Sequence, residues 1–275
     1  MKNYAEFGLK EMIKKYGEWT AYDIQLADNV YTYQQRYPFF QLSDTVQMIR
    51  DFSKRNFSDL RIVDLACLEG QYAIEFGIQG ATVIGIEGRE ANIQKAIFAK
   101  EVLGVNNTTF IQDDVRNLSV EKYGLFDVVF CSGILYHLDV PDVFNFLDSI
   151  AQVCNGFAII DTHISINPTV SFVHNNYTYN GEYYIEHTQN SSKEERLNLK
   201  WASLDNEKAF WLTKASLYNY LKRSGFSYIL EKPRTDGGHT NAGERITILA
   251  FKSDSATLFT SPITNHSKNL DFPEL

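Results

Sequence analysis

The chain has 275 residues and a formal net charge of −8. This acidic balance argues against a surface built for nucleic acid phosphates, which needs basic patches. The hydrophobic content of 44% is enough for one sizeable core. The three cysteines form no C-x-x-C pair, and no run approaches the roughly 18 apolar residues of a membrane span. These features predict a cytoplasmic protein with no disulfide framework, zinc site or membrane segment.

Residues 1–42 are predicted to form an N-terminal cap. Residues 3–16 have apolar side chains at a loose helical spacing, and residues 17–42 are irregular and aromatic. Tyr33 and Arg36 are candidate substrate contacts in this segment, because the guanidinium of Arg36 can bind a carboxylate. The alternative is a cap that only covers hydrophobic surface.

Residues 61–90 predict a strand, a tight turn, a helix and a second strand. The β-branched run at 62–65 is typical of a buried parallel strand, and residues 81–86 form a second such run. Two parallel strands joined by a helix begin a Rossmann-like sheet, which binds ligands beyond the carboxyl ends of its strands. Asp64 and Glu87 lie in that region of the two strands.

A carboxylate at the end of the second strand suits a ribose diol, because it can accept hydrogen bonds from both hydroxyl groups. Glu87 is that carboxylate. The turn after the first strand has one glycine, Gly70, where the dinucleotide fingerprint has three. The sequence therefore predicts a nucleoside-binding edge that is not a dinucleotide site.

Helix and strand patterns continue to alternate after Glu87. Residues 90–103 predict an amphipathic helix with Lys95 on its exposed face, and residues 108–112 predict a third strand followed by Asp113 and Asp114. A fourth strand is predicted at 126–131, a helix at 141–153 and a fifth strand at 156–161. His163 comes directly after this fifth strand.

Residues 164–209 break this alternation with a polar, tyrosine-rich sequence that includes Tyr183. The segment is too long for a passive connector, so we expect a lid over the substrate, the alternative being a surface excursion. A helix at 214–224 and strands at 226–231 and 245–252 follow, with His239 in the loop between the strands. The tail, 253–275, has no periodicity and is predicted to be loose.

Four segments in order resemble the motifs of the class I S-adenosylmethionine (SAM) methyltransferases. The first is DLACLEG at 64–70, which resembles the motif D-x-G-x-G-x-G or its variant D-(L/I/V)-G-C-x-x-G, with Ala66 in place of a glycine. The run FDVVFCSGILYHL at 126–138 is similar to the fourth motif of the family. The resemblance covers residues 43–252. It implies an α/β, Rossmann-like, seven-stranded sheet of order 3-2-1-4-5-7-6, with strand 7 antiparallel, a cap before it and the lid after strand 5.

The resemblance also implies the cofactor and the residues that bind it. SAM would bind at the carboxyl edge of the sheet, and S-adenosylhomocysteine (SAH) would leave. Asp114 would accept a hydrogen bond from the adenine amino group, which is only a donor, although a helix cap would also explain an aspartate there. The implied cofactor residues are Asp64, Ala66, Cys67, Gly70, Glu87, Gly88, Asp113, Asp114, Val115, Ser132, Gly133 and Tyr136.

Two histidines are candidate catalytic residues, because a neutral imidazole can accept a proton from a hydroxyl group. His163 is the first candidate, and Asp161 could orient its ring. His137 is the second, with a structural or cofactor-side role as the alternative. The candidate substrate contacts are Tyr33, Arg36, Tyr183 and His239. No third ligand accompanies Asp161 and His163, so no metal site is predicted.

The predicted function is transfer of a methyl group from SAM to a small organic substrate at oxygen. Two alternatives stay open. The chain is distantly similar to the tRNA wobble-uridine methyl- and carboxymethyltransferases, so tRNA modification is one. A SAM-binding module without turnover is the other, suggested by Ala66 and Leu68 at glycine positions. The sequence does not indicate an oligomeric state.

Overall fold

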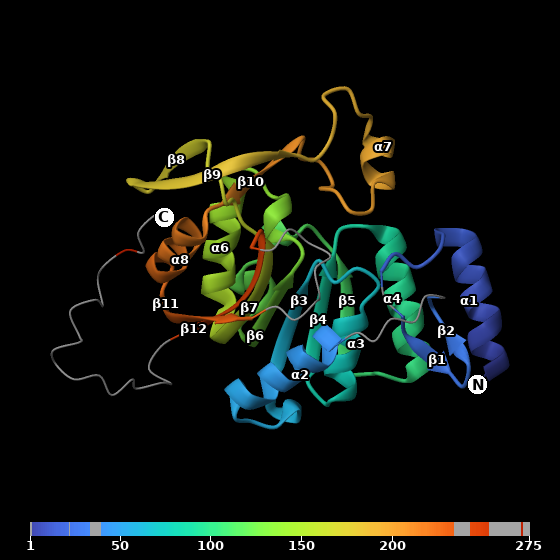
Figure 1. Ribbon diagram of the computed structural model, residues 1–275. Helices are drawn as coiled ribbons and strands as arrows, with labels where there is room; N and C mark the ends of the chain where they lie inside the picture. The colour runs from blue at the N-terminus through green and yellow to red at the C-terminus, as the bar shows by residue number, and fades with distance from the viewer. Residues whose placement is uncertain (1, 22, 34–39, 234–242, 253–270, 272–275) are drawn as a thin grey trace. The chain divides into compact units, whose positions relative to one another are not determined.

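The computed structural model describes residues 2–21, 23–33, 40–233, 243–252 and 271 (Figure 1). Two predicted substrate contacts, Arg36 and His239, lie outside these residues, as does the predicted tail except for Asp271. The chain divides into two compact units. The first is Met1–Leu118 with Gly124–Phe130, and the second is Ser119–Tyr123 with Cys131–Leu275.

The first unit begins with the predicted cap, which is a helix followed by a two-stranded antiparallel hairpin. Both elements pack against helix α4, beside which they lie in Figure 1. Gly8 of the first helix has no side chain to clash with Phe98 of α4, where an added Cβ would come within 2.5 Å of the ring. The elements are α1 (Lys2–Tyr16), β1 (Gln25–Ala27), β2 (Val30–Tyr31), α2 (Phe40–Ser53) and η1 (Phe57–Asp59).

Parallel strands and crossover helices make up the rest of the first unit. The strand β3 pairs in parallel with β4, and β4 pairs in parallel with β5. Helices α3 and α4 pack against β4 and β5. One expectation is wrong here: Lys95 of α4 is fully buried, although the helical pattern placed it on the exposed face. The elements are β3 (Arg61–Leu65), α3 (Gln71–Ile78), β4 (Thr82–Glu87), α4 (Glu90–Leu103), β5 (Thr108–Gln112) and η2 (Val115–Asn117).

The second unit contains the remaining strands and helices, except that β6 (Phe126–Ser132) is divided between the two units. Strand β12 is antiparallel to both β7 and β11. The elements are α5 (Val120–Tyr123), η3 (Leu135–His137), α6 (Asp142–Val153), β7 (Cys154–His163), β8 (Val170–His174), β9 (Tyr177–Ile185), α7 (Lys193–Asn198), β10 (Lys208–Leu212), α8 (Lys214–Arg223), β11 (Phe226–Lys232) and β12 (Arg245–Lys252).

The segment predicted to be a lid forms a three-stranded antiparallel sheet in the order β10-β9-β8. This sheet is anchored by an aromatic cluster around Phe144 of α6. The Phe144 ring contacts Phe172 of β8, Tyr179 of β9 and Phe210 of β10, with centroid distances of 5.7, 5.0 and 6.5 Å. Packing of this kind distinguishes the segment from a loose surface excursion.

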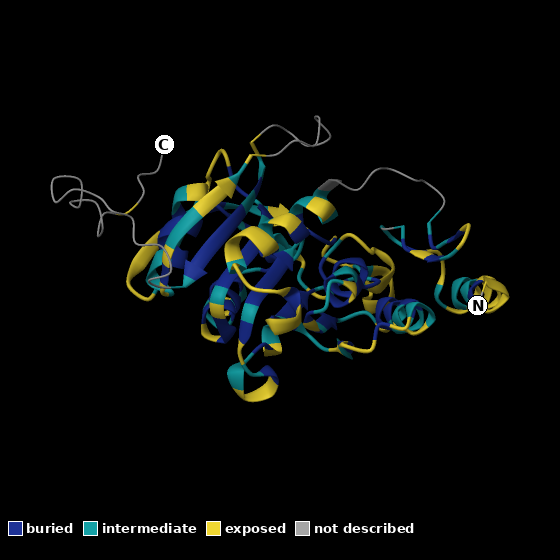
Figure 2. Cartoon of the chain, turned by 90° about the horizontal axis from the view of Figure 1, so that it is seen from below, coloured by how far each residue is buried: buried dark blue, intermediate teal, exposed yellow. Residues whose placement is uncertain are grey.

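One sheet contains seven strands in the order β11-β12-β7-β6-β3-β4-β5, where β6 is Phe126–Ser132. If the seven strands are numbered 1 to 7 along the chain, as in the sequence prediction, this order is 6-7-5-4-1-2-3. It is the predicted order read from the opposite edge of the sheet. The predicted Rossmann-like α/β fold is therefore confirmed. Figure 2 shows buried residues concentrated along these strands, because strands covered on both faces bury nearly every side chain.

None of the helices in the described residues is both long enough and apolar enough to cross a membrane. In the same residues, no group of three or more histidine, cysteine or carboxylate side chains is arranged to hold a metal ion.

Candidate functional site

The turn after β3 holds two non-glycine residues in the left-handed region of backbone space. Ala66 has a φ of 55° and Leu68 a φ of 49°. These are the positions where the resembling motif has glycine, and a side chain there costs about 1–3 kcal/mol. Hydrogen bonds hold the turn in place: Cys67 N–H donates to the Ile86 carbonyl at 3.0 Å, and Leu68 N–H donates to the Glu87 carboxylate at 3.1 Å.

Gly70 meets two requirements that no other residue can meet at this position. Its φ is 82°, and an added Cβ would lie 2.5 Å from the Phe110 ring and 2.9 Å from the Ala96 Cβ. The turn therefore passes directly against β5 and α4 before α3 begins. Asp64, at the end of β3, accepts a hydrogen bond from Ala73 N–H of α3 at 3.1 Å. Burial raises the pKa of Asp64 well above its usual range. The side chain thus lies inside the fold, where its bond to Ala73 joins β3 to α3.

Glu87, at the end of β4, is a buried carboxylate that is bound to backbone on both sides. It accepts from Leu68 N–H and, at 2.8 Å, from Arg89 N–H. Burial raises its pKa, and these bonds together with the Arg89 charge partly offset that rise. A carboxylate has about four acceptor positions. The oxygens of Glu87 can therefore also accept hydrogen bonds from a ligand's hydroxyl groups.

The acidic pair after β5 already has partners in the chain. Asp114 caps η2 and forms an ion pair with Arg116, with Oδ2 and Nη2 2.6 Å apart. Partial burial alone would raise the pKa of Asp114, but the Arg116 bonds outweigh it and the pKa lies below its usual range. Asp113 donates from its backbone to the Glu87 carbonyl at 3.1 Å, and the adjoining Val115 is buried. Gly88 accepts a bond from Gln112 at 3.3 Å, so the ends of β4 and β5 are joined.

A buried ion pair, which the sequence did not reveal, lies under this turn. Lys95 of α4 and Glu69 of the turn are 0% and 1% exposed, with Nζ and Oε1 3.5 Å apart. Lys95 Nζ also donates to the Glu18 carbonyl at 2.6 Å and lies 5.4 Å from the centre of the Trp19 ring. Thr20 N–H donates to Glu69 Oε1 at 2.7 Å. The pair thus fastens the segment between α1 and β1 onto the turn.

Several buried polar atoms around this pair have no hydrogen-bond partner among the residues that the structure describes. They come from the N-terminal segment, the turn, the start of α3 and the first half of α4, and they include donors and acceptors: Trp19 Nε1, Thr20 Oγ1, Glu69 Oε2, Gln71 Oε1 and Asn92 Nδ2. An unpaired buried polar atom costs about 1–3 kcal/mol. Such a cluster is suited to a bound polar ligand that has both cationic and anionic groups.

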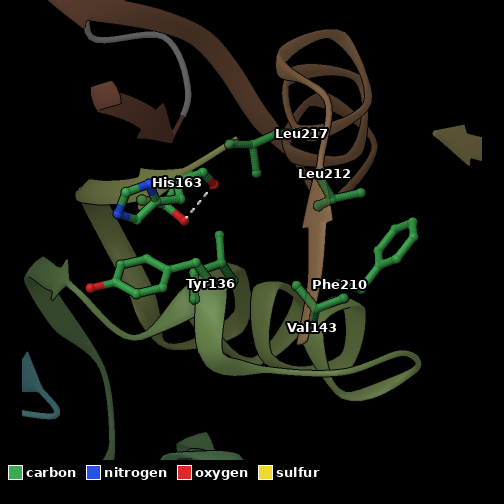
Figure 3. Close-up of a pocket in the computed structure, with 8 residues that line it drawn as sticks. Tyr136, Val143, His163, Phe210, Leu212 and Leu217 are labelled. Atoms are coloured by element: carbon green, nitrogen blue, oxygen red, sulfur yellow. Dashed lines mark hydrogen bonds between the residues drawn. The ribbon is translucent and has the colours of Figure 1, made fainter. Parts of the chain in front are cut away.

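The second unit brings Tyr136 together with His163, near the end of β7 (Figure 3). The ring of His137 lies beside that of Tyr136, with centroids 4.3 Å apart. The Tyr136 ring meets the His163 ring edge-on, with centroids 4.7 Å apart. Gly133, with a φ of 83°, follows Ser132 at the end of β6 and donates to the Asp161 carbonyl at 3.0 Å. A cavity of about 10 Å³ beside Tyr136 and His163 has room for about one water molecule, so it is not a substrate pocket.

His163 is held by aromatic contacts. Its ring stacks on Trp211 with centroids 4.8 Å apart, and its buried Nδ1 atom has no hydrogen-bond partner in the described chain. Burial, and then the Arg245 charge, lowers its pKa. The expectation that Asp161 orients this ring is wrong. The Asp161 carboxylate instead accepts from Arg245 Nε at 2.6 Å and from Thr247 Oγ1 at 2.5 Å.

His137 has the carboxylate partner that His163 lacks. Its Nδ1 atom lies 2.8 Å from Oε1 of Glu186, which follows β9. Sequence reasoning missed Glu186, because a contact across 49 positions leaves no local pattern. Tyr183, a predicted substrate contact, contacts Phe210 and Lys208 on β10. Tyr33 is another predicted substrate contact, and its backbone N–H donates to the Asp23 carboxylate at 3.3 Å. Neither contact shows a substrate-binding role.

The ends of three parallel strands in the first unit thus carry the carboxylates that the sequence predicts at a nucleoside-binding edge. Residues 34–231 match the family model described as "Methyltransferase domain". Because the match covers most of the chain, the protein belongs to this methyltransferase family.

Curated relatives match a shorter part of the chain. It is 32% identical over 127 residues to the "Ubiquinone biosynthesis O-methyltransferase" of Rickettsia akari, covering 44% of this chain and 47% of that protein. The same named enzyme from Acinetobacter baylyi is 33% identical over 82 residues, covering 30% of this chain and 34% of that protein. The chain thus spans about half the length, or less, of these relatives.

Solved structures show the same fold at low sequence identity. The N-terminal domain of EvdMO1, crystallised in the presence of SAH and D-fucose, has a TM-score of 0.67 and 22% identity over 90% of this chain and 97% of that one. Magnesium protoporphyrin IX methyltransferase from Synechocystis PCC 6803, with bound SAH, has a TM-score of 0.52 and 16% identity over 92% and 97% of the two chains.

Proposed function

We propose that this protein is a SAM-dependent enzyme that transfers a methyl group to an oxygen atom of a small organic substrate. The observation that carries the proposal is Glu87, a buried carboxylate at the end of β4 whose two oxygens are bound to the turn after β3 and to Arg89 N–H. Membership of the methyltransferase family supports the proposal, as do the relatives that are O-methyltransferases of ubiquinone biosynthesis and the similar structures solved with SAH or SAM.

The residues of the first unit fit SAM in their chemistry. Glu87 would accept from the ribose hydroxyl groups, and Asp114 or its neighbouring backbone would meet the adenine. The unpartnered donors and acceptors around Glu69 and Asn92 suit the zwitterionic amino-acid end. When bound, SAM supplies an activated methyl group, so much of the catalysis is alignment of the acceptor atom.

An oxygen acceptor is favoured by the second unit. A hydroxyl group must lose its proton during methyl transfer, and His137 and His163 are both able to accept one. The curated relatives are named O-methyltransferases of ubiquinone biosynthesis, and EvdMO1 was crystallised in the presence of D-fucose. A phenol or a sugar hydroxyl is therefore the acceptor class that we propose.

The proposal is tested with SAM labelled in its methyl group and a panel of acceptors: catechols, simple phenols, deoxy sugars, aromatic carboxylates and bulk tRNA. We expect label in a phenol or a sugar, at oxygen. Label only in tRNA would favour the tRNA-modifying alternative. Label only in a carboxylate would show that the acceptor is a carboxylate and not the phenol or sugar hydroxyl group that we propose. SAH binding with no transfer to any acceptor would favour a binding module without turnover.

The Glu87→Ala variant should bind SAH about 1–3 kcal/mol more weakly than the wild type, as judged by calorimetry, because charge-assisted bonds to the ribose are lost. The wild type should bind the 2′,3′-dideoxy analogue of SAH about as weakly, and Glu87→Ala should weaken binding of that analogue little further. A full additional loss with the analogue would mean that Glu87 acts only by holding the turn. Because burial raises the pKa of Glu87, SAH affinity should begin to fall with acidification above the usual glutamate range.

A further inference from the structure

The segment that follows β9 contacts His137 at two points, one on the ring and one on the backbone. Glu186 contacts its Nδ1 atom at 2.8 Å, and Asn206 Nδ2 donates to its backbone carbonyl at 3.0 Å. The side chains of His137 and Glu186 are 12% and 1% exposed. A contact that is almost fully shielded from water holds its geometry far better than a surface pair.

Glu186 is itself held by a second donor. Its Oε2 atom accepts a hydrogen bond from the backbone N–H of Ser203 at 2.8 Å, in a buried position. A backbone N–H can only donate, so this oxygen must remain an acceptor. The other oxygen, Oε1, is the one that faces His137.

An ionised Glu186 can only accept, so the proton of a neutral His137 ring must lie on Nδ1. Nε2 then keeps its lone pair. No hydrogen bond to Nε2 is found within the described part of the chain, and the His137 side chain keeps 12% of its surface exposed. This is the arrangement in which a carboxylate holds a catalytic imidazole in the tautomer that accepts a proton.

We infer that Glu186 is a positioning residue that sets the tautomer of His137, and that Nε2 of His137 takes the proton of the acceptor hydroxyl group during methyl transfer. This inference rests on the proposed function and adds to it the base and the residue that orients it. As the hydroxyl oxygen bonds to the methyl carbon, its O–H bond breaks and the proton passes to Nε2. The methyl–sulfur bond breaks at the same time, and SAH leaves.

Glu186→Gln is the most informative substitution, because it preserves the volume of the side chain and replaces the hydrogen-bond acceptor that faces Nδ1 with a donor. The Ser203 N–H requires an acceptor, so the amide oxygen of the new side chain must face Ser203. The amide NH₂ group then faces Nδ1 of His137, which must accept rather than donate. The ring should therefore carry its proton on Nε2, where it can no longer accept one.

The experiment combines ¹⁵N NMR of the imidazole rings with kinetics, using the full chain. The His137 signals are assigned by their absence in His137→Gln. In the wild type we expect a protonated Nδ1 and an unprotonated Nε2, and in Glu186→Gln the reverse. Turnover on the acceptor found in the panel should fall at least about 10²-fold, with SAH affinity unchanged.

Glu207→Gln is the matched control. Glu207 belongs to the same segment, but its carboxylate pairs with Arg196 at 3.0 Å and lies at the surface, so this variant should keep the wild-type tautomer and turnover. A wild-type ring protonated on Nε2, or a Glu186→Gln protein with unchanged tautomer or near-full turnover, would overturn the inference. Failure of the proposed function would be seen separately, as a wild type that neither binds SAH nor transfers methyl groups. The tautomer measurement does not depend on that result.

Discussion

Replacing His137 with alanine should lower methyl transfer turnover by about 10²–10⁴-fold, the usual contribution of a general base. Affinity for SAH should stay near the wild-type value, because the imidazole is hydrogen-bonded to Glu186 and is not one of the groups that we propose to bind the ribose, the adenine or the amino-acid end of the cofactor. Steady-state kinetics and calorimetry on the same preparations separate these two effects.

His163→Ala is the direct comparison, since the sequence alone favours His163 as the base. Its ring has no orienting carboxylate, and burial with the nearby Arg245 charge lowers its pKa, which makes it a weaker base than an ordinary histidine. Loss of its stacking on Trp211 should reduce turnover less than the His137 substitution does. A larger loss in His163→Ala than in His137→Ala would reverse the assignment of the two histidines.

The Lys95→Met substitution should lower the free energy of unfolding by about 3–5 kcal/mol, because it leaves the buried Glu69 carboxylate without its cation. Chemical denaturation measures the change. The double variant Lys95→Met with Glu69→Gln should recover part of the loss, since no buried charge remains uncompensated.

Lys14→Met, at an exposed position of α1, is the control and should change stability by no more than about 0.5 kcal/mol. A loss in Lys95→Met as small as that of the control would contradict a stabilising role for the buried pair. The size of the expected effect follows from burial, because an ion pair between an exposed lysine and a carboxylate contributes only about 0–1 kcal/mol to stability.

The sheet order could be predicted because each strand and helix has its own local pattern, and because one motif resemblance fixes how they connect. The β-branched runs of β3 and β4 and the crossover between them are readable in this way. Glu87 could be predicted for the same reason: an acidic residue at the end of the second strand has a defined place in the fold.

Contacts between distant residues could not be predicted in that way. Lys95 has the sequence context of a solvent-facing helical position, but the N-terminal segment and the turn after β3 both contact it in the fold. Glu186 approaches His137 because the inserted sheet folds as three paired strands anchored on Phe144, which no periodicity of the segment specifies. Asp161, placed beside His163 in sequence, is instead bound by residues of β12.

Calorimetric titration of the wild-type protein with SAH tests the central claim most directly, because it requires neither the acceptor nor the catalytic base to be known. The account predicts one site per chain with a dissociation constant in the micromolar range, and weaker binding in Glu87→Ala. A folded wild-type protein that shows no binding of SAH or SAM would contradict it.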